Sequence, residues 1–337
     1  MNQMRAATFD AERISVQIEN VPIPQLEPDE LLVRVSRCGI CGSDVSMTED
    51  SPFTMGERFG HEYAGEVVEI GGEVTSFAPG DRVAGLPIVP CGSCEFCLRE
   101  QHFFCSSPAD GMVGFAEYVA LPERGAVKLP SSLDVADGAL VEPMACGLHA
   151  MRLADEVSGQ RVLVLGGGSM ALSAIFWARQ LGAGRIVALS RSRRRDALIG
   201  SLGADVVLGF DQDASVIAEE LGGPPDIIVE AVGKEGMIEL AIKMIRACGT
   251  VLSMGMSMRA EAILPAECNF KEIRLFFPVG YSKVEFIETA EAFGNGRLRA
   301  GELIGGVISL ESLPAQLDLI RESAGSPGKF LVDPTRA

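Results

Sequence analysis

Four cysteines carry the most specific chemical pattern in this sequence. Within fifteen residues the chain places Cys91, Cys94, Cys97 and Cys105. Four thiolates can complete a tetrahedral shell around Zn²⁺, and two-residue gaps let a tight turn direct successive sulfurs at one point. A shell closed by four sulfurs leaves no position for a substrate, so the cluster predicts a structural zinc that folds a loop. Disulfide pairing is the alternative, but bridges across two-residue gaps are usually redox-active.

A second set of potential ligands is spread over three segments. Cys38 and Cys41 lie in a glycine-rich turn, His61 and Glu62 are adjacent, and Glu142 precedes a proline at the start of an expected helix. One cysteine, one histidine and one or two carboxylates form an open zinc site that water or substrate completes. Taken singly, a cysteine usually packs in a core, so the interpretation depends on the co-occurrence of these residues.

A glycine-rich turn at 166–171 follows an apolar strand and opens a helix. Gly166 allows the tight turn, and Gly168 lets the backbone approach a pyrophosphate at the helix N-terminus. Ser169 and Met170 complete the predicted binding loop. Helix–strand packing alone could also explain the glycines, but the surrounding alternation of strands and helices favours dinucleotide binding.

The end of the next strand indicates which dinucleotide binds. NAD-binding sheets place an Asp or Glu there, about 20 residues after the glycines, to accept from the ribose 2′-hydroxyl. This sequence has Ser190 and Arg191 instead, followed by three arginines at 193–195. A hydroxyl beside arginines predicts a 2′-phosphate and therefore NADP(H) over NAD(H). A solvated basic helix start is the alternative, although arginines at a helix N-terminus oppose its dipole.

The predicted cofactor contacts beyond the loop follow three strands of the expected sheet. They are Ser190, Arg191, Arg195, Val232 and Gly255.

Length and composition narrow the class of protein. At 337 residues with 47% hydrophobic content, the chain favours two domains. A net charge of −17 argues against nucleic-acid binding, which needs clustered Lys and Arg. We see no apolar secretory segment at the N-terminus and no run of about 18 apolar residues that would span a membrane. The nine cysteines then favour a reducing, cytoplasmic location.

The two halves of the chain differ in the secondary structure that their sequence patterns predict. The first 145 residues alternate short strands with Pro- and Gly-rich turns, whereas strands and helices alternate from about Arg161 onward. The second pattern predicts a doubly wound parallel sheet. We expect a mainly β catalytic domain from residues 1–147 and 285–337, and a dinucleotide-binding domain from residues 148–284.

Together these motifs resemble the zinc-dependent medium-chain dehydrogenases/reductases of the alcohol dehydrogenase superfamily, and within them the polyol and threonine dehydrogenase branch. The resemblance extends from about residue 5 to 332 and implies an α/β fold with a Rossmann cofactor domain and a GroES-like catalytic domain. The matching segments are Gly39–Asp44, Gly60–Glu62, Gly71–Val83, the four-cysteine lobe at 91–105, Glu142–Ala150, the glycine-rich turn and Leu202–Asp205.

The resemblance also implies roles for single residues. Cys41, His61 and Glu62 take the positions of catalytic zinc ligands, and Glu142 binds the same zinc directly or through water. Ser43 takes the position of the hydroxyl that contacts the substrate oxygen.

Two further positions follow from the same motif. Asp44 matches a carboxylate that steadies the histidine ligand, and Cys38 is not expected to bind metal. Two Zn²⁺ per chain and a homodimer or homotetramer are also implied.

Two departures from the family pattern affect these expectations. Ser46 stands where many relatives have a relay histidine, so the proton must leave through Ser46, a water chain or a cofactor ribose hydroxyl. The segment between Asp44 and Gly60 is short. Positions that could line a substrate cleft, or equally belong to the core, are Val45, Phe53, Met55, Met112, Phe277, Pro278 and Tyr281.

The implied function is hydride transfer between a secondary alcohol or polyol, or the matching ketone or aldehyde, and NADP(H). In such chemistry zinc lowers the pKa of the alcohol hydroxyl, and Ser43 takes its proton. An aryl or primary alcohol dehydrogenase, or an aldehyde reductase, is the alternative within the family. Zinc-free quinone reductases lack these motifs, and a zinc-stabilised NADP-binding protein without turnover is the non-enzyme alternative.

Overall fold

The computed structural model describes residues 3–10, 14–48, 58–257, 259–322 and 328–336. The chain divides into two compact units, one formed by residues 1–142 with 281–337 and the other by residues 143–280. The boundaries expected from the sequence, at 147/148 and 284/285, lie a few residues further along the chain.

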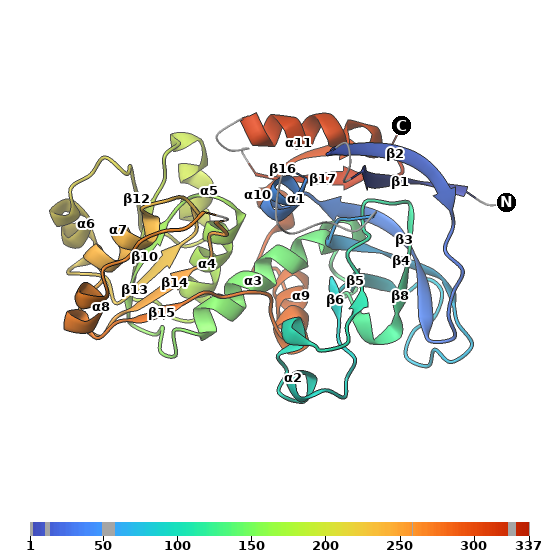
Figure 1. Ribbon diagram of the computed structural model, residues 1–337, viewed down its shortest axis with the longest axis horizontal. Helices are drawn as coiled ribbons and strands as arrows, with labels where there is room; N and C mark the ends of the chain where they lie inside the picture. Colours follow the sequence, from blue (N-terminus) through green and yellow to red (C-terminus); the bar gives the residue numbers. More distant parts are fainter. Residues whose placement is uncertain (1–2, 11–13, 49–57, 258, 323–327, 337) are drawn as a thin grey trace. The chain divides into compact units, whose positions relative to one another are not determined.

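The first unit is built on a mainly antiparallel sheet of seven strands in the order β16-β17-β3-β4-β5-β9, with β8 also pairing with β3 (Figure 1). These strands are β3 (Glu30–Gly39), β4 (Glu62–Ile70), β5 (Arg82–Gly85), β8 (Tyr118–Pro122), β9 (Ala126–Lys128), β16 (Ile304–Ser309) and β17 (Lys329–Asp333). Two small sheets join β1 (Gln3–Asp10) to β2 (Ser15–Pro22) and β6 (Ile88–Val89) to β7 (Ala109–Asp110).

Short helices and turns complete this unit. They are α1 (Gly42–Met47), α2 (Glu95–Leu98), α9 (Lys283–Gly294), α10 (Ala300–Leu303) and α11 (Leu313–Glu322), with 3₁₀ turns at η1 (His102–Phe104), η2 (Glu123–Gly125), η3 (Val135–Leu140) and η5 (Leu310–Ser312).

Strand β3 is central because it pairs with three other strands. Its C-terminal end lies between β4 and β17, where Gly39 is opposite Glu62 on one side and Leu331 on the other. Strand β17 therefore lies beside β3 at the point where the first candidate ligands follow β3.

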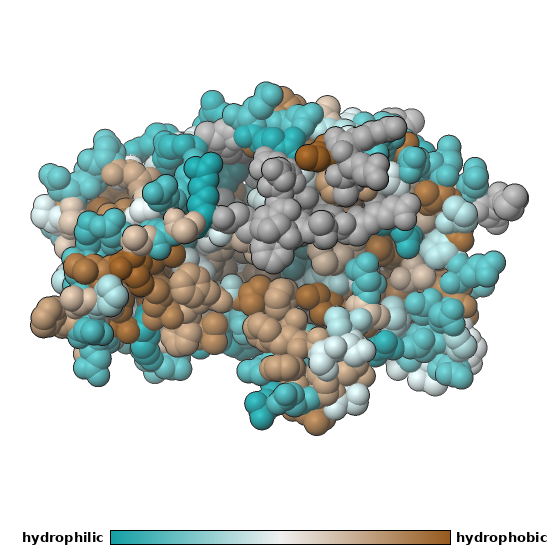
Figure 2. Space-filling view, viewed as in Figure 1, coloured by the Kyte–Doolittle hydropathy of each residue, from teal (hydrophilic) through white to brown (hydrophobic). Residues whose placement is uncertain are grey.

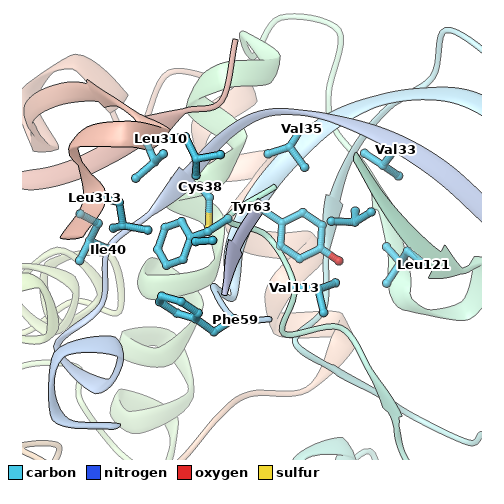
Figure 3. Packing of buried hydrophobic residues seen from close by; sticks show 14 of the residues in the cluster. Val33, Val35, Cys38, Ile40, Phe59, Tyr63, Val113, Leu121, Leu310 and Leu313 are labelled. Atoms are coloured by element: carbon cyan, nitrogen blue, oxygen red, sulfur yellow. The ribbon is translucent and has the colours of Figure 1, made fainter. Parts of the chain in front are cut away.

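The core of this unit gathers around Tyr63, which is fully buried among β-branched and aromatic side chains (Figure 3). Two glycines provide the space for its ring, since a Cβ at Gly85 or Gly114 would lie 2.3 Å or 2.6 Å from Tyr63 atoms. Cys38 also lies in this core, and burial raises the pKa of its thiol well above the usual range. A buried neutral thiol behaves as a small hydrophobic residue.

The second unit confirms the predicted doubly wound parallel sheet. Its strands are all parallel, in the order β12-β11-β10-β13-β14-β15, and the chain crosses to the other side of β10 after β12 (Figure 1). This is the point where such sheets bind ligands. The strands are β10 (Arg161–Leu165), β11 (Arg185–Leu189), β12 (Val206–Leu208), β13 (Ile227–Glu230), β14 (Thr250–Ser253) and β15 (Arg274–Phe276).

Helices connect these strands, and α3 begins at the last residues of the first unit. They are α3 (Val141–Arg152), α4 (Ser169–Gln180), η4 (Arg193–Arg195), α5 (Asp196–Ser201), α6 (Ala214–Leu221), α7 (Met237–Met244) and α8 (Pro265–Lys271).

A buried carboxylate joins the N-terminal ends of the two central strands. Asp226 accepts hydrogen bonds from the Arg161 backbone N–H and Nε, both at 2.8 Å, and from the guanidinium of Arg246. Burial alone would raise the pKa of Asp226, but these hydrogen bonds lower it far below its usual range. Asp226 therefore stabilises the folded state only while it is ionised.

We expect Asp226→Asn to lower the free energy of unfolding by about 1.5–3 kcal/mol at pH 7, because hydrogen bonds to a charged acceptor are lost. Since the folded pKa is lowered, this contribution is complete above the unfolded pKa of about 3.9 and is lost as pH falls below it. Urea unfolding at pH 7 and at pH 3 measures both effects.

The matched control is Asp155→Asn, which removes the partner of Arg274 from an exposed ion pair. It should change the unfolding free energy by less than about 1 kcal/mol. An Asp226→Asn penalty as large at pH 3 as at pH 7 would contradict the proposed charge dependence.

Candidate active site

Cys41 is held at the junction between a strand and a short helix. It follows β3 by two residues and is the residue before the first turn of α1. The Asp44 carboxylate accepts the backbone N–H of Cys41 at 2.8 Å, which closes the turn. Cys41 thus presents its thiol at a fixed place at the end of β3.

His61 and Glu62 enter the site from the neighbouring strand. Gly60 has a φ of +96°, a left-handed conformation that favours glycine, and Glu62 is the first residue of β4. Asp44 Oδ1 faces His61 Nδ1 at 3.3 Å. Burial would lower the pKa of His61, but Asp44 and the Cys41 thiol raise it well above its usual range. The other ring nitrogen, Nε2, is left for a ligand.

The structure brings Cys41, His61 and Glu62 together. One potential ligand atom from each lies within 4.8 Å of those of the other two. Glu62 Oε2 is buried and has no hydrogen-bond partner among the described residues. Thiolate, imidazole and carboxylate are zinc ligands, and three of them leave the fourth position of a catalytic site open. This donor set fits a zinc ion.

Glu142 is buried nearby but does not belong to that group of three. It lies in the first turn of α3, and its Oε1 accepts a hydrogen bond from the Tyr281 hydroxyl at 3.0 Å. Burial raises the pKa of Glu142 to about 7, against the lowering effect of His61. Tyr281, expected as a cleft or core residue, is buried and also contacts this carboxylate.

Lys329 is a member of the site that no sequence motif marks. This first residue of β17 is 7% exposed, and its Nζ donates to Glu62 Oε1 and, at 3.2 Å, to the Ile40 carbonyl. Burial would lower the pKa of Lys329, but Glu62 raises it. Gly39 makes room for the pair, because a Cβ there would lie 2.1 Å from Glu62 Oε2.

Two other predicted residues of this site lie on α1, and two lie outside the described residues. Ser43 is half-buried two residues after Cys41. The Ser46 hydroxyl donates to the Gly42 carbonyl at 3.1 Å and can still accept a proton. Phe53 and Met55 lie outside the described residues.

The four-cysteine lobe has the dimensions of a tetrahedral metal site. The Sγ atoms of Cys91 and Cys97 are 3.8 Å apart, and those of Cys94 and Cys105 are 3.9 Å apart. A tetrahedron with metal–sulfur bonds of about 2.3 Å has edges of about 3.8 Å, whereas a disulfide needs about 2.05 Å. The spacing fits zinc rather than disulfides.

Backbone N–H groups favour thiolates in this lobe. Hydrogen bonds led by the Ser106 N–H lower the pKa of Cys94 to about 5, and those led by the Ser93 N–H lower the pKa of Cys91 to about 7. Burial opposes this at Cys97, whose pKa it raises to about 12. Because thiolates are the form that binds metal, Cys91 and Cys94 are the cysteines most prepared for a cation.

The predicted dinucleotide loop lies between β10 and α4. Gly166 has a φ of +122°, and a Cβ there would lie 3.1 Å from the Ala231 carbonyl. A Cβ at Gly168 would meet nothing within 4 Å, so this backbone is open to a ligand. Ser169 and Met170 begin α4, whose first-turn N–H groups lack intrahelical partners.

The residues after β11 carry arginines near that loop. Ser190 is buried, and its hydroxyl donates to the Ser192 carbonyl at 3.0 Å. The Arg195 guanidinium donates to the Gly167 carbonyl, while Arg191 is exposed. Arg195 is thus fixed against the glycine-rich turn, and Arg191 is free to meet a ligand from solvent.

Glu230 organises the two other predicted cofactor positions. Its Oε1 accepts the backbone N–H groups of Val232 and Gly233 at 2.7 Å and 2.8 Å, and its Oε2 accepts from the Ser253 hydroxyl at 3.1 Å. Its carbonyl accepts the Gly255 N–H at 3.1 Å. One buried carboxylate therefore holds the loops after β13 and β14 together, a role that the single Glu in an apolar strand did not indicate.

Two segments of the chain match known family models. Residues 27–131 match the family model of the alcohol dehydrogenase GroES-like domain, and residues 169–294 match that of the zinc-binding dehydrogenases. Sorbitol dehydrogenase of Gallus gallus is 34% identical over 274 residues, covering 77% of both chains. D-xylulose reductase A of Aspergillus niger is 30% identical over 332 residues, covering 92% of both.

Solved structures agree in fold. A zinc-binding dehydrogenase from Sinorhizobium meliloti 1021, bound to NADP, matches with a TM-score of 0.90 at 30% identity. The match covers 99% of this chain and 100% of that one.

The helices in the described part of the chain are all too short or too polar to span a membrane.

The two metal sites should respond differently to loss of a ligand. We expect Cys97→Ser to lose one zinc per chain and to lower the Tm by at least about 5 °C, because a structural zinc contributes folding free energy directly. Cys41→Ser should lose the other zinc and keep a Tm within about 2 °C of wild type. Metal analysis and thermal unfolding measure both.

Cys248→Ser is the control, since that exposed cysteine belongs to neither group. It should keep two zincs and the wild-type Tm. An unchanged metal count in Cys97→Ser would contradict the four-cysteine site.

Proposed function

The chain belongs to the zinc-binding dehydrogenases with an alcohol dehydrogenase GroES-like domain, and from this premise we propose that it transfers hydride between a secondary alcohol or polyol and NADP(H). The family membership confirms the resemblance predicted from the motifs. Members of this family are oxidoreductases.

The observation that carries the proposal is the three-residue donor set of Cys41, His61 and Glu62, which lies at the ends of β3 and β4. Three ligands of different chemistry leave a coordination position for a substrate oxygen, whereas the four-cysteine lobe leaves none. We therefore assign one catalytic and one structural zinc to each chain, with the structural ion bound by the four cysteines.

The reaction divides between these parts. A zinc ion held by the three ligands would supply the Lewis acidity that lowers the pKa of an alcohol hydroxyl, and bound NADP⁺ would accept the hydride. Ser43, two residues from Cys41, takes the hydroxyl proton. Ser46, water or a ribose hydroxyl then carries that proton outward.

The buried charges around the donor set keep its geometry. Asp44 faces His61 Nδ1 and fixes the orientation of the imidazole. Lys329 binds one oxygen of Glu62 and leaves Oε2 for the ion. Glu142, whose Oε1 accepts from the Tyr281 hydroxyl, would bind the same ion directly or through water.

The dinucleotide would bind on the second unit. The open backbone at Gly168 and the first-turn N–H groups of α4 suit a pyrophosphate. Ser190 and Arg191 would contact the 2′-phosphate, with Arg195 in support. The NADP-bound relative supports this cofactor, and the Glu230 loops with Val232 and Gly255 would meet the nicotinamide end.

Two relatives support the substrate class. Sorbitol dehydrogenase and D-xylulose reductase act on a polyol and a ketose, so we propose a polyol or a related vicinal diol. None of the nine cysteines, all of which lie in the described part of the chain, forms a disulfide, and we propose a cytoplasmic location on this basis.

An apolar surface on the second unit supports a homodimer or homotetramer. Figure 2 shows apolar side chains gathered over α8 and β15, the edge strand of the parallel sheet. Leu264, Phe270 and Phe277 are 59%, 91% and 64% exposed. Exposed apolar patches and free strand edges mark protein contacts. A monomeric mass by light scattering at micromolar concentration would refute this assembly.

The zinc-loaded protein should reduce NADP⁺ with at least one member of a panel of sugar alcohols, vicinal diols, amino alcohols and aryl alcohols. His61→Ala should remove this turnover, by at least about 10³-fold, while the protein stays folded. Absorbance at 340 nm measures the reaction. No turnover with any alcohol, in protein that holds two zincs, would leave a binding protein rather than an enzyme.

Cofactor preference should depend on the residues after β11. Ser190→Asp with Arg191→Ala should shift the kcat/KM preference toward NAD⁺, since a charge-assisted pair is worth about 1.5–3 kcal/mol, or roughly 10- to 150-fold. The wild-type preference for NADP⁺ should weaken at high salt, because exposed charges are screened.

Arg193→Ala is the matched control, because Arg193 pairs with Asp196 at 2.7 Å. It should shift the preference much less. A wild-type protein that uses NAD⁺ with the higher kcat/KM would overturn the 2′-phosphate assignment.

A further inference from the structure

A histidine in the four-cysteine lobe contacts a helix that is distant in sequence. His102, in η1, accepts the backbone N–H of Lys283 on its Nδ1 at 3.1 Å, across 181 residues. Lys283 is the first residue of α9. The lobe is thereby joined to the N-terminus of that helix.

The His102 contact provides a hydrogen-bond acceptor for a backbone N–H group at the start of α9. The first N–H groups of a helix have no intrahelical acceptor. Ser282 Oγ accepts from the Glu285 N–H, and Glu285 Oε2 accepts from the Ser282 N–H. These bonds leave the Lys283 N–H for His102, and burial lowers the pKa of His102, which keeps Nδ1 able to accept.

A second path joins the same helix residue to the base of the lobe. Lys283 Nζ donates to the Arg124 carbonyl at 2.8 Å, and Arg124 Nε donates to the Pro90 carbonyl at 3.0 Å. Pro90 immediately precedes Cys91. The start of α9 is therefore joined to the four-cysteine lobe at two places. One is at His102, near the C-terminal end of the lobe, and the other is at Pro90, just before its first cysteine.

On its other side, the start of α9 reaches the candidate catalytic site. Tyr281 lies two residues before Lys283, is 8% exposed, and packs its ring 5.3 Å from that of Phe286 in α9. Its hydroxyl donates to Glu142 Oε1 at 3.0 Å. The position of Tyr281 thus depends on where α9 begins.

We propose that His102 is a positioning residue that transmits the order of the four-cysteine lobe to Tyr281, and through Tyr281 to Glu142. The lobe then has a role beyond local folding, because its metal fixes η1 and η1 fixes the start of α9. The kinetic part of the test rests on the proposed function, and the exchange part does not.

Amide hydrogen exchange tests the coupling without turnover. In zinc-loaded protein, His102→Ala should raise exchange in the peptide covering residues 281–290 by about five- to tenfold, the equivalent of one lost hydrogen bond. His102→Asn keeps an acceptor at the Nδ1 position and should restore wild-type exchange. Metal analysis of each sample verifies that two zincs remain.

Arg99→Ala is the lobe control, since Arg99 is exposed and its ion pair with Glu95 lies within the lobe. It should leave exchange at 281–290 unchanged. Equal exchange in wild type and His102→Ala, or in His102→Asn and His102→Ala, would overturn the coupling.

A double-mutant cycle tests the route through Tyr281. His102→Ala and Tyr281→Phe should each lower kcat/KM several-fold, and the double variant should be no worse than Tyr281→Phe alone. Losses that multiply would show that His102 acts independently of Tyr281, which overturns the route. Absence of turnover in wild type would instead refute the proposed function, while the exchange result still decides the coupling.

Discussion

The first unit is organised by the need to pair charges that are shielded from water. Asp44, His61, Glu62, Glu142 and Lys329 are all nearly or fully buried. Removing an ion from water costs several kcal/mol even after relaxation, so each such group must face a partner. The Glu62–Lys329 pair is the deepest of these contacts, and it joins the start of β17 to the start of β4 across the end of β3.

The second unit uses buried carboxylates in a comparable way at the two ends of β13. Asp226, just before the strand, joins the N-terminal ends of the central strands through arginines. Glu230, its last residue, joins the loops at the opposite edge through backbone N–H groups and a serine. One carboxylate holds the sheet and the other shapes the surface that a nicotinamide would meet.

The features that could be predicted from the sequence are those whose residues lie close together along the chain. The gaps around Cys94 place four sulfurs together, and the turn at Gly166 follows from its position between a strand and a helix. Lys329 is 267 residues from Glu62, and His102 is 181 from Lys283. Such pairs depend on tertiary packing, which local periodicity does not encode.

The return of β17 has a consequence for how the protein is made. The ribosome adds about 5–20 residues per second, so the 267 residues between Glu62 and Lys329 take roughly 13–53 s to synthesise. The segment 143–280 is complete within that interval and can fold as a unit. Glu62 has no Lys329 to pair with until those 267 residues have been added, so β3 and β4 cannot close their charged interior before then. Nascent chains cut short before Lys329 would carry a finished nucleotide-binding half and an unfinished metal-binding half.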